Sequence, residues 1–310
     1  MRVLVTGATG FVGAHVVRAL VGGGHDVAAL LQPGVSTARL DGLEGRYAAL
    51  PGRLEEARAL RPALAEYRPN VCIHLAWYAE PGKYLEAPEN VSALTGSLAL
   101  LEELAGAGCA HVVAVGSCFE YAAATGPVAE ESPTRPDTLY AAAKLSLALT
   151  GERLAARRGF GFAWARLFLL YGPGEDPRRA IPSLMRSLLR GEPFPATAGE
   201  QVRDYLHVED VATALVALAA RRATGVFNIC SGVPVTMRAV METVGRIAGR
   251  EDLIRFGERP YRDWEPMYLC GEPGRLKAQG WTPRWTLPDG LRNTFEWWAR
   301  NDDAGERGTE

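Results

Sequence analysis

Short apolar runs alternate with stretches of helical periodicity along the first 170 residues. The apolar runs predict buried strands at residues 3–5, 26–31, 46–50, 71–76, 111–116 and 163–170. The stretches between them predict helices at residues 15–20, 54–67 (interrupted by Pro62), 90–105 and 139–157. Strands that alternate with helices are typical of βαβ units. The pattern therefore predicts an α/β protein with a doubly wound parallel sheet.

The second half of the chain has a different pattern. A proline- and arginine-rich segment, 173–195, surrounds one predicted helix at 181–190. A helix at 208–220 and a strand at 226–229 are expected to return to the sheet. From residue 232 onward, short elements predict a smaller lobe that contains Trp264, Trp281, Trp285, Trp297 and Trp298. Because ligands in open α/β sheets bind beyond the carboxyl ends of the strands, a lobe there would close a cleft.

A glycine-rich turn follows the first predicted strand. Gly7, Gly10 and Gly13 stand at three-residue spacing between that strand and the first helix. A strand that passes through glycines into a helix N-terminus forms an anion site, because backbone N–H groups and the helix dipole face a pyrophosphate that can approach closely. A tight turn without a ligand is the competing interpretation. The position between strand and helix favours a dinucleotide site in a Rossmann sheet.

The domain organisation follows from these patterns. Residues 1–170, completed by about 205–230, are expected to form the dinucleotide-binding domain. Residues 171–204 and 231–300 are expected to form a C-terminal substrate-binding lobe, and 301–310 a flexible tail.

Composition narrows the class of protein. The net charge of −2 gives no electrostatic footprint for nucleic acid or an anionic membrane. The five cysteines are scattered without a CxxC spacing, which favours reduced cytosolic thiols over disulfides or a zinc site. No apolar run approaches the roughly 20 residues that span a bilayer. We therefore expect a cytoplasmic protein without a metal, a nucleic-acid partner or a membrane partner.

Tyr140 and Lys144 stand four residues apart on the long predicted helix and so share one face. A buried ammonium beside a phenol favours the phenolate and lowers the phenol pKa, which suits acid–base catalysis. A packed tyrosine beside a solvated lysine is the common alternative. Here the pair follows Gly116-Ser117, at the carboxyl end of a strand, so Ser117 is predicted to bind a substrate oxygen that Tyr140 protonates or deprotonates. Lysine is rare in this chain, with only Lys83, Lys144 and Lys277, and this draws attention to Lys144.

Over nearly its whole length the chain resembles the extended short-chain dehydrogenases/reductases of the nucleotide-sugar branch. The matching landmarks are Thr6-Gly7-x-x-Gly10-x-x-Gly13, His74-Leu75-Ala76, Asn90, Ser117 with Tyr121, Tyr140-x-x-x-Lys144, Arg166 with Tyr171-Gly172-Pro173, Arg203-Asp204-Tyr205-Leu206-His207-Val208-x-Asp210, Phe227-Asn228-Ile229-Cys230-Ser231-Gly232 and Gly280-Trp281-x-Pro283.

The resemblance implies a role for each matching residue. Tyr140 would be the acid/base, Lys144 would hold the nicotinamide ribose, and Ser117 would bind the reacting oxygen. The cofactor would be bound by Gly7, Thr9, Gly10, Phe11, Val12, Gly13, Gln32, Arg53, Leu54, Leu75, Ala76, Asn90, Tyr140 and Lys144. The substrate would be bound by Trp77, Tyr78, Cys118, Phe119, Leu169, Arg178, Arg203 and Arg262.

Several of these roles have alternatives. Arg203 would pair with the diphosphate of a nucleotide sugar, or else bridge to Asp204 or Asp210. The aromatic residues Trp77, Tyr78 and Tyr84 would wall the sugar site, with ordinary core packing as the competing account. His207 is interpreted as a structural residue, because the tyrosine performs the proton transfer.

The chain departs from the family pattern at positions that bear on function. Strand two ends in Leu31-Gln32, where the family usually has an acidic residue that binds the adenosine ribose of NAD, and Arg53 stands where an aspartate is common. Leu169 replaces an asparagine. Ser117-Cys118-Phe119 stands in place of the Thr-Asp-Glu of sugar 4,6-dehydratases.

These observations predict a function with one close rival. The best candidate is NADPH-dependent reduction of a 4-keto, 6-deoxy nucleotide sugar, with NADP(H) preferred and NAD(H) also usable. The rival is an NAD-dependent nucleotide-sugar 4-epimerase. A non-catalytic dinucleotide-binding regulator is the alternative from another class, and the intact Ser117, Tyr140 and Lys144 argue against it. We expect a homodimer.

Overall fold

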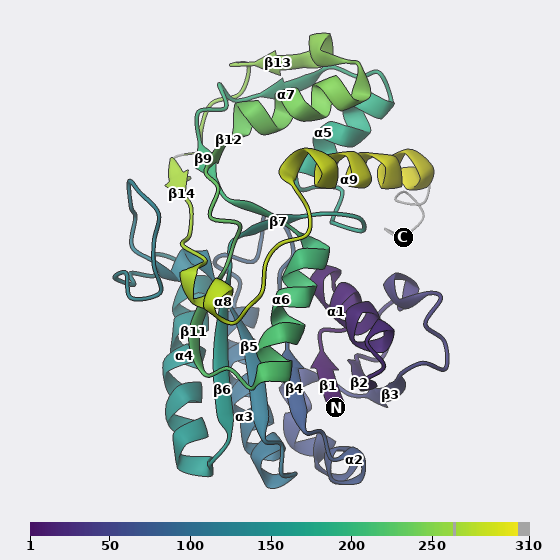
Figure 1. Ribbon diagram of the computed structural model, residues 1–310, viewed down its shortest axis with the longest axis vertical. Helices are drawn as coiled ribbons and strands as arrows, with labels where there is room; N and C mark the ends of the chain where they lie inside the picture. Colours follow the sequence, from purple (N-terminus) through teal and green to yellow (C-terminus); the bar gives the residue numbers. More distant parts are fainter. Residues whose placement is uncertain (263–264, 303–310) are drawn as a thin grey trace.

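A computed structural model describes residues 1–262 and 265–302 of the chain. Trp264 and positions 303–310 of the predicted tail lie outside the described residues. The central feature is a seven-stranded parallel sheet (Figure 1). In spatial order its strands are β11 (Gly225–Ile229), β6 (Gly161–Leu167), β5 (His111–Ser117), β4 (Val71–His74), β1 (Arg2–Thr6), β2 (Asp26–Leu31) and β3 (Ala48–Pro51). The predicted doubly wound α/β fold is confirmed.

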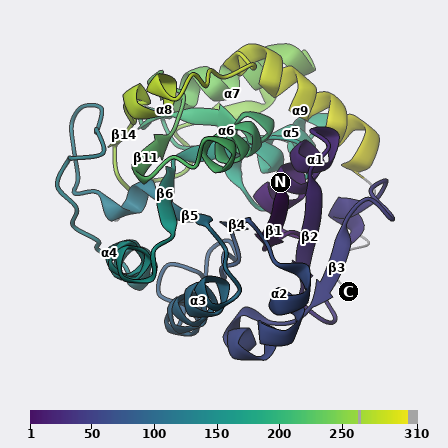
Figure 2. The same cartoon turned by 60° about the horizontal axis from the view of Figure 1, so that its bottom comes forward.

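Helices cover both faces of this sheet, as Figure 2 shows from the end of the molecule. One face carries α1 (Phe11–Gly22) and α6 (Val208–Arg221). The other carries α2 (Arg61–Tyr67), α3 (Glu89–Gly106) and α4 (Leu139–Arg158). Because both faces are covered, the central strands are continuous apolar runs rather than alternating ones, and every residue of β4 and β5 is buried.

Three predicted elements differ in detail. The helix expected at 54–67 is a 3₁₀ segment, Leu54–Leu60, followed by α2. Pro62 lies in the first turn of α2, where its missing N–H costs nothing, so it begins this helix rather than interrupting one. The strand expected at 71–76 ends at His74, because the next two N–H groups bond to the Thr6 side chain. The strand expected at 163–170 is β6 followed by β7 (Leu169–Tyr171), which pairs with β10 (Tyr205–His207).

Three helices and several short strands gather at one end of the molecule (Figure 1). Helices α5 (Ala180–Leu189), α7 (Met237–Ala248) and α9 (Leu287–Asn301) enclose a separate apolar core. Around them lie the short strands β8 (Phe194–Ala196), β9 (Val202–Arg203), β12 (Val235–Thr236), β13 (Ile254–Phe256) and β14 (Tyr268–Leu269), and helix α8 (Gly274–Ala278) packs against β11.

Three tryptophans of the second half are divided between two apolar cores. Trp298 is buried in the core of α5, α7 and α9, and Trp297 packs against that core. Trp281 instead belongs to the core on the α1 and α6 face of the sheet, where its Nε1 donates a hydrogen bond to Thr213 at 3.0 Å. Within residues 1–262 and 265–302, no helix combines the length and the apolar character needed to cross a membrane.

Candidate active site

The glycine turn between β1 and α1 is tightly packed. The Gly10 N–H donates to Gly7 O at 3.0 Å, and Gly10 is the N-cap of α1 without a side-chain hydrogen bond. A Cβ on Gly7 would lie 2.7 Å from the Ala76 nitrogen, and one on Gly13 would lie 2.0 Å from Gly7 O. The first turn of α1 contains no acidic residue. Glycine is therefore required here for close backbone approach, and the exposed helix N-terminus suits a pyrophosphate.

A buried hydrogen-bonded chain holds the segment after β4 against this turn. The Ser97 hydroxyl donates to Ala93 O at 2.6 Å, so the His74 Nε2–H donates to Ser97 and its Nδ1 accepts from Thr6. The Thr6 oxygen in turn accepts from the N–H groups of Leu75 and Ala76, both at 3.1 Å. Burial lowers the pKa of His74 to about 3, so the ring stays neutral. This motif positions backbone and leaves no group free for proton transfer.

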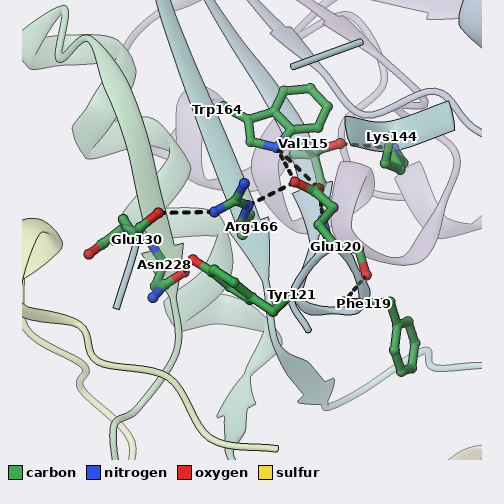
Figure 3. Close-up of polar contacts among 10 residues, drawn as sticks. Val115, Phe119, Glu120, Tyr121, Glu130, Lys144, Trp164, Arg166 and Asn228 are labelled. Carbon is green, nitrogen blue, oxygen red and sulfur yellow. Dashed lines mark hydrogen bonds and ion pairs between the residues drawn. The ribbon is translucent and has the colours of Figure 1, made fainter. Parts of the chain in front are cut away.

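The structure brings Ser117, Tyr140 and Lys144 together where β5 meets the start of α4. Lys144 is 3% exposed, and its ammonium donates to Val115 O at 2.8 Å (Figure 3). The Ser117 oxygen accepts from the Phe119 N–H at 3.2 Å, which leaves the serine hydrogen free to donate elsewhere. The Ser117 hydroxyl also lies close enough to the Tyr140 phenol to act on its pKa, which it lowers.

The pKa of Tyr140 is shifted in the opposite direction to the one expected from the sequence, where Lys144 was predicted to lower it. Burial raises the pKa of Tyr140, and the nearby Ser117 hydroxyl only partly opposes the rise. Burial lowers the pKa of Lys144 to about 7, while the charge of Glu120 acts in the other direction. Tyr140 therefore keeps its proton at neutral pH, because loss of hydration outweighs the attraction of a neighbouring ammonium.

Glu120, which the sequence did not single out, lies between Trp164 and Arg166 in the turn after β5 (Figure 3). Its carboxylate accepts from the Ser117 N–H at 2.7 Å, from Trp164 Nε1 at 3.0 Å and from Arg166 Nε at 2.8 Å. Arg166 also stacks on the Tyr121 ring, with 4.4 Å between the guanidinium carbon and the ring centroid. The sequence signal that could have revealed Glu120 is the Ser-x-x-Glu spacing of a capping box. The structure contains this capping box, formed by Ser117 and Glu120.

The aromatic residues after β4 pack around Tyr140 and Lys144. The Trp77 ring centroid lies 3.8 Å from the Lys144 ammonium, and the Trp77 Nε1 donates to Asn90 Oδ1 at 2.8 Å. The Tyr84 ring meets the Tyr140 ring edge-to-face, with 4.9 Å between centroids. Asn90 is fully buried, and it binds the loop that carries these aromatic residues rather than reaching the glycine turn.

Arg203 has a partner that the sequence did not predict. It is 4% exposed and pairs with Glu265 at 2.8 Å. The two predicted partners are occupied elsewhere: Asp204 accepts from the N–H groups of Ser231 and Gly232, and Asp210 accepts from the backbone N–H groups of residues 284 and 285. Bridging of Arg203 to Asp204 or Asp210 is therefore wrong.

Two other predicted substrate residues, Arg178 and Tyr78, share one carboxylate partner, Glu80. Arg178 is exposed and pairs with Asp176 at 2.8 Å and with Glu80 at 3.3 Å, and Tyr78 donates to the same Glu80. The neighbouring Arg179, missed by the sequence reasoning, lies over the Tyr84 ring at 5.4 Å. These contacts tie the loop after β4 to the loop before α5.

The structure also describes the four remaining predicted substrate residues, which are Cys118, Phe119, Leu169 and Arg262. Burial raises the pKa of Cys118 to about 12, so this thiol stays protonated, and Phe119 is half-buried beside it. Leu169 begins β7. The carbonyl of Arg262 accepts from the Glu265 N–H at 3.0 Å.

At the far end of the glycine turn, two arginines lie near the end of β2. Arg53 Nη2 donates to Pro33 O at 3.4 Å, in the turn that follows Gln32. Arg39 bonds to Thr9 O at 3.4 Å. Leu54 is buried next to Arg53. Among the residues that the structure describes, no group of three or more His, Cys, Asp or Glu side chains could hold a metal ion.

A parallel sheet with a glycine turn after β1 and a Ser117, Tyr140 and Lys144 cluster at the end of β5 is the arrangement of an extended short-chain dehydrogenase/reductase. The model of the NAD dependent epimerase/dehydratase family matches residues 3–230. The chain belongs to this family.

Individual relatives are similar over nearly their whole length. A UDP-glucose 4-epimerase of Streptomyces lividans is 29% identical over 98% of this chain and 99% of its own. A dTDP-6-deoxy-L-talose 4-dehydrogenase (NAD(+)) of Aggregatibacter actinomycetemcomitans is 27% identical over 87% of this chain and 99% of its own. The crystal structure of the Thermus thermophilus UDP-glucose 4-epimerase in complex with NAD is 26% identical, covers 96% of this chain and 99% of its own, and superposes with a TM-score of 0.86.

Proposed function

We propose that this protein reduces the C4 ketone of a 4-keto-6-deoxy nucleotide sugar, with NADPH as the preferred cofactor. The observation that carries the proposal is the protonated state of Tyr140 beside Ser117, because a reductase needs a proton donor at neutral pH. The similarity to a dTDP-6-deoxy-L-talose 4-dehydrogenase supports it, since 4-dehydrogenation is the reverse of 4-keto reduction.

The chain's own residues supply binding and the proton. The free hydrogen of Ser117 donates to the ketone oxygen and orients it. Tyr140 then gives its proton to that oxygen as negative charge develops there, and the Lys144 ammonium stabilises the resulting phenolate. The cofactor, when bound, supplies the hydride that C4 receives. One hydride and one proton convert the ketone to an alcohol, and Tyr140 regains its proton from solvent.

The residues present fit a dinucleotide. The turn at Gly7, Gly10 and Gly13 would receive the pyrophosphate, and its tight shape depends on glycine because a Cβ on Gly7 or Gly13 would collide with the backbone. Lys144 would hold the nicotinamide ribose. Arg203 is buried and already paired with a carboxylate, so we propose that the diphosphate of the nucleotide sugar replaces Glu265 as its partner. Phosphate oxygens match the guanidinium fork in the same way as a carboxylate does.

A homodimer is proposed through the outer faces of α3 and α4. Each of these helices exposes a large apolar side chain to solvent, Val91 at 52% and Leu149 at 60%. Sedimentation analysis of the wild type and of Leu149→Glu measures this association.

The 4-epimerase is the second candidate, favoured by the similarity to UDP-glucose 4-epimerases. An epimerase retains its NAD through turnover, whereas a reductase exchanges cofactor in every cycle. We expect the purified protein to carry little bound NAD and to oxidise NADPH stoichiometrically with a 4-keto-6-deoxy nucleotide sugar. Extraction of bound nucleotide, followed by chromatography, measures the first quantity. A protein that is purified loaded with NAD and interconverts UDP-sugars without added cofactor is an epimerase.

We expect no 4,6-dehydratase activity. That reaction needs an acid to expel the C6 hydroxyl and a base to remove the C5 proton. The corresponding positions hold Cys118, whose thiol pKa of about 12 makes it a very weak acid, and Phe119, which has no proton to exchange. Mass spectrometry of nucleotide hexoses incubated with the protein and NAD checks this, and loss of water would contradict it.

We expect NADPH to bind more tightly than NADH. No carboxylate follows β2 to repel a 2′-phosphate, and Arg53 reaches the turn where that phosphate would lie. A charge-assisted hydrogen bond contributes about 1.5–3 kcal/mol, so Arg53→Met is expected to weaken NADPH binding by at least about tenfold. NADH binding should be unchanged, and Arg250→Met, an exposed site after α7, is the control. Titration calorimetry with both nucleotides decides, and equal affinities would reject the preference.

A further inference from the structure

The indole of Trp77 is placed directly against the ammonium of Lys144. The distance from Nζ to the ring centroid is 3.8 Å, within the range of a cation–π contact. We propose that Trp77 is a positioning residue that holds the Lys144 ammonium in place and in its charged form, rather than a wall of the sugar site. The proposal rests on the proposed function only in taking Lys144 as a residue of the active site.

The ammonium is poorly solvated and has few other partners. Lys144 is 3% exposed, and Val115 O is the one hydrogen-bond acceptor that the described part of the chain offers its three N–H groups. The Trp77 face covers the ammonium from the loop after β4. Burial alone would favour the neutral amine, so a group that stabilises the charge is needed.

The other charged and titratable groups around Lys144 do not replace this contact. Glu120, from the turn after β5, favours the charged form, but its carboxylate oxygens are bonded to Ser117, Trp164 and Arg166. His74, from β4, is neutral, and its pKa is lowered in part by Lys144 itself. Tyr140, on the same helix face, is protonated, and its ring centroid lies 5.9 Å from Nζ.

The indole is held in a fixed orientation. Its Nε1 donates to Asn90 Oδ1 at 2.8 Å. The Asn90 amide nitrogen donates to Tyr84 O at 2.7 Å and to Ala87 O at 2.9 Å. These two bonds identify the nitrogen end of the amide, so the oxygen Oδ1 faces the indole. The ring edge is thereby anchored, and its negative face is presented to the ammonium. A residue that only filled space would need no such anchor.

The small number of lysines allows a direct test that needs no substrate. Only Lys83, Lys144 and Lys277 are present, so ¹³Cε-lysine labelling gives three NMR signals, which Lys83→Arg and Lys277→Arg assign. The pKa of Lys144 is then titrated in the wild type, in Trp77→Phe and in Trp77→Leu. We expect a decrease of about one pH unit in the leucine variant and a smaller decrease in the phenylalanine variant. Lys83 and Lys277 are exposed and serve as internal controls.

Fluorinated tryptophan separates the electrostatic contact from packing. Fluorine withdraws electron density from the ring face, so 5-fluoro- and then 5,7-difluorotryptophan are expected to lower the Lys144 pKa stepwise with the indole retained. In the Trp77→Phe background the same labelling is expected to leave the Lys144 pKa unchanged, because no indole remains beside the ammonium. The other tryptophans are still fluorinated in this variant, so it controls for their indirect effects. This comparison also serves if the leucine variant does not fold.

Two results would overturn the proposal. An unchanged Lys144 pKa in both the variants and the fluorinated proteins would show that the indole only fills space. An increase would show that Trp77 acts by excluding water. Because neither result depends on turnover, the proposal about Trp77 and the proposed reductase activity can fail independently.

Discussion

Replacing Tyr140 by phenylalanine is expected to lower kcat by about 10²- to 10⁴-fold, which is the usual contribution of a positioned general acid. The ring packs edge-to-face on Tyr84 and Trp77, and phenylalanine keeps both contacts. The variant loses only the oxygen that Ser117 contacts and that would protonate the substrate. Steady-state oxidation of NADPH with a 4-keto-6-deoxy nucleotide sugar gives kcat.

The control for this variant is Tyr67→Phe. Tyr67 donates to the Asp26 carbonyl at 2.9 Å, at the opposite end of the sheet strands, so its loss is expected to leave kcat unchanged. Cofactor affinity should also be preserved in Tyr140→Phe. A phenylalanine variant with the kcat of the wild type would show that Tyr140 is not the acid.

Removing Glu120 is expected to be the most destabilising single change near the site. The carboxylate is fully buried and paired with Arg166, which is 4% exposed, so Glu120→Ala leaves a buried guanidinium without its counter-charge. Breaking a buried ion pair in this way costs about 3–5 kcal/mol of the free energy of unfolding. Chemical denaturation, followed by tryptophan fluorescence, measures the loss.

A double variant separates the contribution of Glu120 to stability from its contribution to catalysis. Burial raises the pKa of Glu120 even beside Arg166, so the pair does not recover the full cost of its dehydration. Glu120→Leu combined with Arg166→Met is therefore expected to recover most of the stability. It should remain low in kcat, because the Ser117 N–H no longer has an acceptor. Full recovery of kcat would mean that Glu120 does not position Ser117.

The sequence predicted the sheet well because each of its signals is local. A buried strand is a run of apolar residues, and the glycine turn and the Tyr140-x-x-x-Lys144 spacing are short motifs. The partner of Arg203 could not be predicted in this way. Glu265 lies more than sixty residues away, and only the packing of β9 against β14 brings the two together.

The direction of the Tyr140 pKa shift could not be predicted from the sequence either. The identity of a neighbouring lysine is visible in the chain, but the depth of burial that opposes its effect is not. The same holds for Trp77, because its contact with Lys144 depends on how the loop after β4 folds back against α4. Side chains on irregular segments are positioned by the whole fold.

The order of the strands also has a consequence for folding during synthesis. Helix α6 and the edge strand β11 are made after the other six strands of the sheet, yet α6 packs beside α1 in one core, and β11 completes the sheet next to β6. A nascent chain of the first 170 residues therefore exposes the apolar face of α1 and an unpaired edge of β6 to solvent. Contacts between such distant segments form slowly, so this is the interval in which chaperones or aggregation compete with folding.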